Sequence, residues 1–143
     1  MKKQIFAVAA VLFLSALVPK QSQAQYTTKA NIPFSFQAGN ARMPAGEYEV
    51  RPSLTVGGRQ QSIRRTDSSA GAFVLTNLAD SRDTSGDPKL IFHCYSHDCF
   101  LYEIWNRNGQ GWRLMESPRE KELSRASAEN ELAMVSLPLT VEP

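Results

Sequence analysis

The sequence predicts a mainly β protein, either an antiparallel β-sandwich or a small β-barrel of about 7–8 strands, with one short helix near the C-terminus. Three observations favour this fold class. Short segments rich in β-branched and aromatic residues recur along the chain, and clusters of Gly, Pro, Asn and Asp separate them. A single stretch, late in the chain, carries a helix-start pattern. The order of the strands does not follow from these observations.

The N-terminus has the three parts of a secretory signal. Lys2 and Lys3 are followed by an apolar run over residues 5–18 and by a small residue, Ala24, after which we expect cleavage. Removal of this signal peptide, residues 1–24, leaves residues 25–143 as one β-rich domain. The apolar run is shorter than the roughly 20 residues of a transmembrane helix. The sequence therefore predicts an exported protein, periplasmic or extracellular, that is not an integral membrane protein after cleavage.

The charge of the chain argues against a nucleic-acid partner. The whole sequence has 16 basic and 14 acidic residues, and three lysines leave with the signal, so the mature chain has 13 − 14 = −1. A nucleic-acid-binding domain needs a dense basic face, and the Arg64-Arg65 pair is too small to supply one.

In the first half of the mature chain, strands are predicted within residues 25–36 and over residues 47–51, where apolar and polar residues alternate, and over residues 61–66 and 72–78, of which the last is largely apolar. Pro33 favours an edge position for the first of these. Residues 38–46 contain the turn formers Gly39-Asn40 and Pro44-Ala45-Gly46. Residues 54–56 extend the second strand in this interpretation, and residues 80–88 form an exposed loop.

The densest apolar region after the signal is Lys89 to Trp105, KLIFHCYSHDCFLYEIW, which predicts a β-hairpin with its turn at residues 96–98. If Cys94 lies opposite Cys99, alternation divides the side chains between two faces. One face then carries Leu90, Phe92, Cys94, Cys99, Leu101 and Trp105, and the other carries Ile91, His93, Tyr95, Phe100, Tyr102 and Ile104. Because both faces are largely apolar, we expect a central position in the sheet.

The remaining elements follow the hairpin. Residues 106–111, NRNGQG, predict a turn and residues 112–115 a short strand. Ser117, Pro118 and Glu120 have the spacing of an N-cap, a first-turn proline and a capping-box acid, so a helix is expected from Ser117 to about Ala126. Residues 131–141 predict a last strand, in which a proline indicates an edge or a bulge.

Three segments together resemble an uncharacterised family of small exported bacterial β-rich proteins. They are IPFSFQAGNARMPAGEYEV (Ile32 to Val50), LIFHCYSHDCFLYEIW and SPREKEL. The resemblance implies a hairpin ending in tryptophan before a short charged helix. Cys94 and Cys99 depart from the family pattern, whose hairpin turn usually contains glycine and no cysteine pair. PAGEYEV is also similar to a strand of transthyretin-like sandwich modules.

Two cysteines in an exported chain most simply form a disulfide, so Cys94 and Cys99 are expected to bond across the hairpin. The alternative is a zinc or copper site, because His93, Cys94, His97 and Cys99 all carry ligand atoms for these metals. Alternation sends His93 and Cys94 to opposite faces, which argues against a shared metal. No cofactor is otherwise expected.

No catalytic residues are predicted. A cysteine nucleophile next to a histidine lacks an evident orienting group here, and an oxidised cysteine is no nucleophile. The aromatic side chains suggest a binding surface instead, made of Tyr95, Tyr102, Trp105 and Trp112.

The resulting hypothesis is a non-enzymatic exported β-domain that binds or scaffolds something at the cell envelope, with an envelope protein or a glycan as its partner. The alternative from another class is a metal-binding or redox protein that uses the Cys/His hairpin. The two make different predictions: the first needs a solvent-facing aromatic face and tolerates Cys94→Ser and Cys99→Ser, whereas the second loses its bound ion when a histidine or a cysteine of the hairpin is changed.

Overall fold

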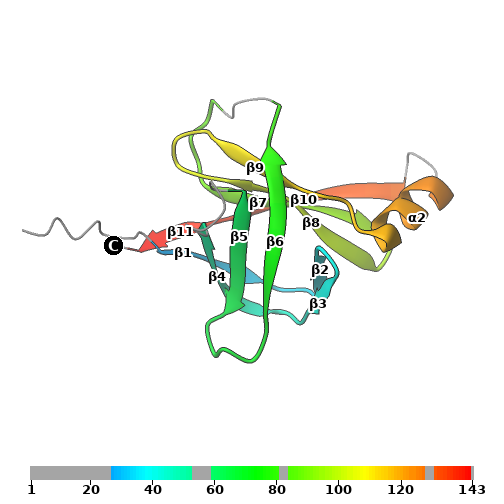
Figure 1. Ribbon diagram of the computed structural model, residues 1–143, viewed down its shortest axis with the longest axis horizontal. Coiled ribbons are helices and arrows are strands. Elements are labelled where there is room, and N and C mark those ends of the chain that lie inside the picture. Colours follow the sequence, from blue (N-terminus) through cyan, green and yellow to red (C-terminus); the bar gives the residue numbers. More distant parts are fainter. Residues whose placement is uncertain (1–26, 53–58, 81–83, 128–130, 143) are drawn as a thin grey trace, which may run out of the picture.

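The computed structural model describes residues 27–52, 59–80, 84–127 and 131–142. It is mainly β, with one short helix near the C-terminus of this described part, as the sequence predicts (Figure 1). The elements are β1 (Thr27–Ile32), β2 (Phe36–Ala38), β3 (Ala41–Met43), β4 (Gly46–Pro52), β5 (Gln60–Arg65), β6 (Gly71–Leu78), β7 (Lys89–Tyr95), β8 (Asp98–Trp105), β9 (Gly111–Leu114), α2 (Pro118–Ala126), β10 (Leu132–Pro138) and β11 (Thr140–Glu142).

The eleven described strands form one sheet whose main path runs β10-β7-β8-β9-β6-β5-β4-β1-β11, with β2 paired to both β3 and β8. Only Leu139 separates β10 from β11, so the two ends of the path are consecutive in the chain. Strand β6 pairs with β5 along its first part and with β9 along its last. Strand β6 at one place, and the consecutive strands β10 and β11 at another, therefore join the two crossing layers of strands in Figure 1.

The structure divides two of the predicted strands into two strands each. It also contains one strand, β3, that was not predicted. Ile32, Phe34 and Phe36 were expected to alternate along one strand, but β1 ends before Pro33 and β2 begins at Phe36, because proline cannot donate to a ladder. The predicted strand over residues 131–141 is interrupted at Leu139. Strand β3 lies in the segment that the turn residues predict as a loop. The signal segment and residues 54–56 lie outside the described residues.

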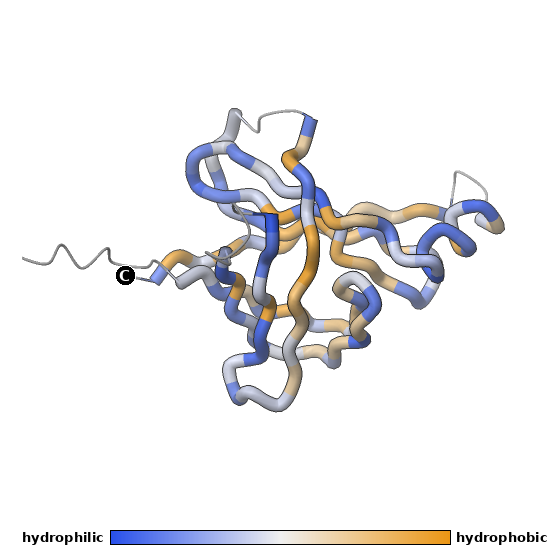
Figure 2. Tube along the Cα trace, in the orientation of Figure 1, coloured by the Kyte–Doolittle hydropathy of each residue, from blue (hydrophilic) through white to orange (hydrophobic). Residues whose placement is uncertain are grey.

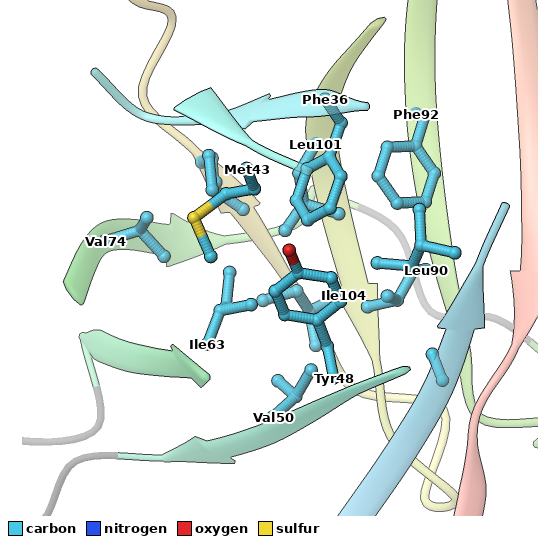
Figure 3. Packing of buried hydrophobic residues seen from close by; sticks show 14 of the residues in the cluster. Phe36, Met43, Tyr48, Val50, Ile63, Val74, Leu90, Phe92, Leu101 and Ile104 are labelled. Carbon is cyan, nitrogen blue, oxygen red and sulfur yellow. The ribbon is translucent and has the colours of Figure 1, made fainter. Parts of the chain in front are cut away.

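The core lies between the layers and is built from inward-facing side chains of nearly every strand (Figure 3). Tyr48 is fully buried, and its hydroxyl donates a hydrogen bond to the Pro44 carbonyl oxygen at 2.5 Å. Phe36 packs edge-on against both Tyr48 and Phe92, with ring centroids 5.2 and 5.4 Å apart. The alternation of inward and outward side chains that predicts each strand therefore also builds the core.

Strands β7 and β8 form the expected hairpin and lie between β10 and β9, so the hairpin is central as predicted. The predicted assignment of its side chains to two faces is wrong at the C-terminal end of β8. Ile91 pairs with Glu103 while Phe92 pairs with Leu101, which makes Tyr102 the extra residue of a β-bulge. Beyond this bulge the alternation is reversed. Ile104 joins the core, and Trp105 lies on the outer face, where its indole Nε1 donates to Glu103 Oε2 at 2.9 Å.

Helix α2 begins as its sequence predicts. Ser117 is the N-cap and its hydroxyl accepts a hydrogen bond from the Glu120 backbone N–H at 3.2 Å, with Pro118 in the first turn. The buried side chain on this helix is Glu120, whereas the expected apolar contacts are weaker: Leu123 is half-buried and Ala126 is exposed. The described helix is too short and too polar to span a membrane.

Candidate functional site

The two cysteines are bonded to each other. Cys94 and Cys99 are directly paired across the hairpin, their Cα atoms are 4.0 Å apart, and their sulfurs form a disulfide. The bond closes a loop with a sequence separation of 5, so it constrains the turn and little else.

The other residues of the proposed metal set do not converge with the cysteines. The His93 ring stacks on Tyr102, with centroids 3.6 Å apart, on the face opposite Cys94. His97 is exposed in the turn. Both sulfurs are committed to the disulfide and so are not thiolate ligands in this state. Among the described residues, no three His, Cys, Asp or Glu side chains are grouped so as to hold a metal ion.

The four aromatic residues expected to form a binding surface are distributed differently. Tyr95 and Trp105 are buried, and they pack against other parts of the chain. Tyr102 is half-buried between His93 and the Arg113 guanidinium, which lies 5.2 Å from the ring centroid. Trp112 is half-buried and lines a hollow of about 420 Å³. They do not share one accessible face.

A wider groove, of about 560 Å³, lies on another part of the molecule. Strand β6 forms one wall through residues 72–75, the turn between β2 and β3 forms another, and residues 114–118 close it toward α2. In Figure 1 the β2–β3 turn and the chain that leads into α2 lie on the side of β6 away from β5. We call this feature the β6 groove.

Large apolar side chains are exposed around the β6 groove. Phe73 is 72% exposed, Leu75 58% and Met115 60%, and all three line it. The outward side of neighbouring β5 is polar, so the apolar stripe belongs to β6, as the hydropathy colouring in Figure 2 also shows. Exposed apolar residues that cluster beside a hollow are typical of a binding site, whereas scattered ones are not.

The backbone of β6 is also open on this side. In the β5–β6 ladder, Arg65 N–H donates to the Ala70 carbonyl at 2.8 Å and Thr76 N–H donates to the Arg59 carbonyl at 2.7 Å. Bonded pairs in an antiparallel ladder alternate, so Ala72 and Val74 point their backbone groups toward β5 as well. Phe73 therefore points its N–H and C=O to the opposite edge. No described strand pairs with that edge at Phe73.

The edge is open because β9 is short. Strand β9 covers residues 76–78 of β6, and the ladder ends with a Met115 N–H to Leu75 carbonyl hydrogen bond of 3.4 Å. Two residues later Ser117 caps α2, and the chain turns away from β6. The position opposite Phe73, where a longer β9 would pair with β6, is therefore part of the β6 groove.

One charged side chain lines the β6 groove. Glu116, exposed and next to Met115, lines it near Leu75. Arg64 is exposed and paired with Gly71, but it lies on β5, across the other edge of β6, and does not line the groove. The groove is therefore acidic at its Leu75 end.

A second cluster of interest lies beneath the first turn of α2. Glu120 is only 4% exposed, and its Oε1 atom has no hydrogen-bond partner among the described residues. The nearest cationic candidate is His93, whose Nδ1 atom lies 3.8 Å from this oxygen. Burial, with help from nearby Glu116, raises the pKa of the Glu120 carboxyl to about 7. Burial also lowers the pKa of His93.

Glu103 shows what a satisfied buried carboxylate looks like in the same protein. Its Oε1 atom accepts hydrogen bonds from Nε and Nη2 of Arg113 at 3.1 and 3.0 Å, and its Oε2 atom accepts one from Trp105. Arg113 also donates a hydrogen bond from Nη1 to Asp80 Oδ2 at 2.8 Å. Glu103 thus has partners on both oxygens, whereas Glu120 has a buried oxygen to which no described residue donates a hydrogen bond.

Comparisons with protein-family models, with curated proteins and with solved structures gave no match. The functional argument therefore depends on the site itself. Reasoning from the sequence missed the β6 groove, although one signal for it is present: the helix start at Ser117 follows only two residues after the strand that ends near Met115.

Proposed function

We propose that this protein is an exported, non-enzymatic binding domain that holds an apolar segment of a protein partner at the cell envelope. The observation that carries the proposal is the β6 groove, where Phe73, Leu75 and Met115 are exposed together beside an open strand edge. A chain that leaves such a surface exposed is more soluble when a partner covers it.

Two features support export. The first 24 residues have the basic, apolar and small-residue parts of a secretory signal. The Cys94–Cys99 disulfide is a bond that persists in oxidising compartments and is rare in the cytosol. Each is independent of the other, because one lies in the leader and the other in the folded domain.

The exposed chemistry favours a polypeptide over a glycan. A sugar ring is usually held by an exposed aromatic plane with polar groups around it, but Tyr95 and Trp105 are buried. The β6 groove instead offers aliphatic, phenyl and thioether side chains. These match apolar side chains of a protein.

Site-specific photocrosslinking tests this proposal. The photoreactive amino acid benzoyl-phenylalanine is placed at position 73 of the full chain and activated in intact cells that export the protein. The control places it at position 134, because Met134 is 64% exposed but lies on β10 and does not line the groove. We expect a heavier adduct from position 73 and none from position 134.

Two results would contradict the proposal. The first is the absence of any adduct at position 73, or equal adducts at positions 73 and 134. The second is an adduct composed of two copies of this chain, which would make the groove a dimer interface instead of a partner site.

A further inference from the structure

The edge of β6 beside the groove, which no described strand pairs at Phe73, suggests how a partner is bound. We propose that the β6 groove takes up an extended segment of the partner as an added β-strand, antiparallel to β6. The inference rests on the proposed function and specifies its binding mode.

The ladder between β9 and β6 defines where the added strand would lie. Ala79 N–H donates to the Gly111 carbonyl at 2.9 Å, and Met115 N–H donates to the Leu75 carbonyl. Extending the same alternation by two residues reaches Phe73, whose backbone N–H and C=O have no described strand opposite them. An extended segment at this position would continue the β9 ladder along the rest of β6.

The opposite wall of the groove is suited to a strand as well. It includes Ala38 and Ala41, which are small side chains that allow close approach of a backbone. Strand β3, which begins at Ala41, pairs with β2 alone among the described strands, so its second edge is also unpaired by them. A single strand would approach β6 from this side without a sheet behind it, whereas β6 of a second copy would bring its own β5 along.

Side-chain contacts would add specificity to the backbone pairing. Every second residue of the added strand would lie on the outward face of the sheet, beside Phe73 and Leu75. These positions call for apolar, preferably β-branched, residues. In strand addition generally, main-chain hydrogen bonds provide affinity and alternate side chains provide selectivity.

The acidic end of the groove favours one direction of the segment. An antiparallel segment has its N-terminal end near Leu75, beside Glu116, and its C-terminal end near Gly71. Charge complementarity therefore favours a partner segment with a basic residue before its apolar stretch. A parallel segment of the same composition would place this basic residue at the Gly71 end, away from Glu116.

The test uses the full mature chain and a synthetic peptide in which valine and alanine alternate after an N-terminal lysine. Nuclear magnetic resonance titration follows the backbone amide of Phe73. A matched peptide carries N-methyl groups on its valines, which removes their backbone donors and leaves the side chains unchanged. We expect the first peptide to shift the Phe73 amide and the methylated peptide to bind about tenfold more weakly or worse.

Each outcome bears on the inference. Equal affinity of the two peptides would overturn strand addition, because binding by side chains alone is insensitive to the backbone donors. Failure of the unmethylated peptide to shift Phe73 at millimolar concentration would also overturn it. Neither result would decide the proposed function, since the adduct at position 73 is measured with the natural partner. Phe73→Asp serves as the site control and should abolish the shift of neighbouring amides.

Discussion

At the scale of single residues, two buried glutamates differ in their consequences for stability. Glu103 is paired with Arg113 and Trp105, but Glu120 is buried, and one of its oxygens has no hydrogen-bond partner within the part of the chain that the structure describes. Its pKa of about 7 in the folded protein exceeds the ordinary value of 4.5. The folded state therefore binds more protons than the unfolded state between these pH values, and stability falls as the pH rises through them.

The first prediction concerns Glu120→Gln, which cannot ionise. Because the wild type must ionise a buried carboxyl above pH 7, we expect the variant to be more stable at pH 8, by about 1–3 kcal/mol, and nearly equal to wild type at pH 5. Thermal unfolding at both pH values measures this. His93 titrates in the opposite sense, since its lowered pKa favours the folded state at higher pH, but it is present in both proteins.

The matched control is Glu122→Gln on the same helix, where the side chain is 73% exposed. It should leave the melting temperature within about 1 °C of wild type at both pH values, because isolated surface pairs contribute little. A Glu120→Gln variant that is destabilised at pH 8, or that shifts equally at pH 5 and pH 8, would contradict the assignment of a raised pKa to this carboxyl.

The second prediction concerns two glycines with different surroundings. A Cβ atom at Gly111 would lie 2.8 Å from three ring atoms of Trp105, which is buried. A Cβ atom at Gly71 would have the Ile63 carbonyl oxygen as its nearest neighbour, at 3.5 Å. We expect Gly111→Ala to cost about 1–3 kcal/mol of unfolding free energy in urea titration, and Gly71→Ala to cost much less. Equal costs would show that the packing around Trp105 is misassigned.

At the scale of elements, the start of α2 decides where β9 ends. Ser117 caps the helix and its hydroxyl accepts the Glu120 N–H. The third prediction is that Ser117→Ala destabilises the protein by about 1 kcal/mol through loss of this cap. Ser124→Ala is the control, because Ser124 is exposed in the middle of the helix and its hydroxyl bonds only the Lys121 carbonyl. An equal loss of stability in both variants would contradict the capping role of Ser117.

Most elements could be predicted from the sequence because alternation and turn residues are local signals. The hairpin at 89–105, its central place in the sheet and the cap at Ser117 all follow from residues close in sequence. The bulge at Tyr102 could not be predicted, because one extra residue in a ladder depends on pairing with β7 across the hairpin. That single residue reversed the expected faces of Ile104 and Trp105.

At the scale of the whole molecule, export and the disulfide make a joint prediction about covalent state. We expect the protein recovered from the export compartment without reductant to lack residues 1–24 and to weigh two hydrogens less than its reduced form. Intact mass spectrometry measures both. A full-length chain would refute the signal, and a reduced chain carrying stoichiometric zinc or copper would refute the disulfide and return attention to His93 and His97.

The candidate site could not be predicted from the sequence, for a physical reason. The segment at 72–78 is apolar at both alternating sets of positions, so its exposed face depends on what the rest of the chain covers. Val74 points into the core, whereas Phe73 and Leu75 point outward. That outcome is set by the order of strands and by the early end of β9, which are properties of the assembled sheet.

The claim on which the account depends is that the edge of β6 is open at Phe73, and amide hydrogen exchange of the mature chain tests it most directly. We predict that the Phe73 amide exchanges at least about 100-fold faster than those of Ala72 and Val74, which point toward β5. Asn77 is the internal control, because its backbone faces the same edge as Phe73 but lies opposite Arg113 of β9, so it should exchange slowly. A Phe73 amide as protected as that of Asn77 would mean that the edge is already covered, and would contradict both the binding groove and strand addition.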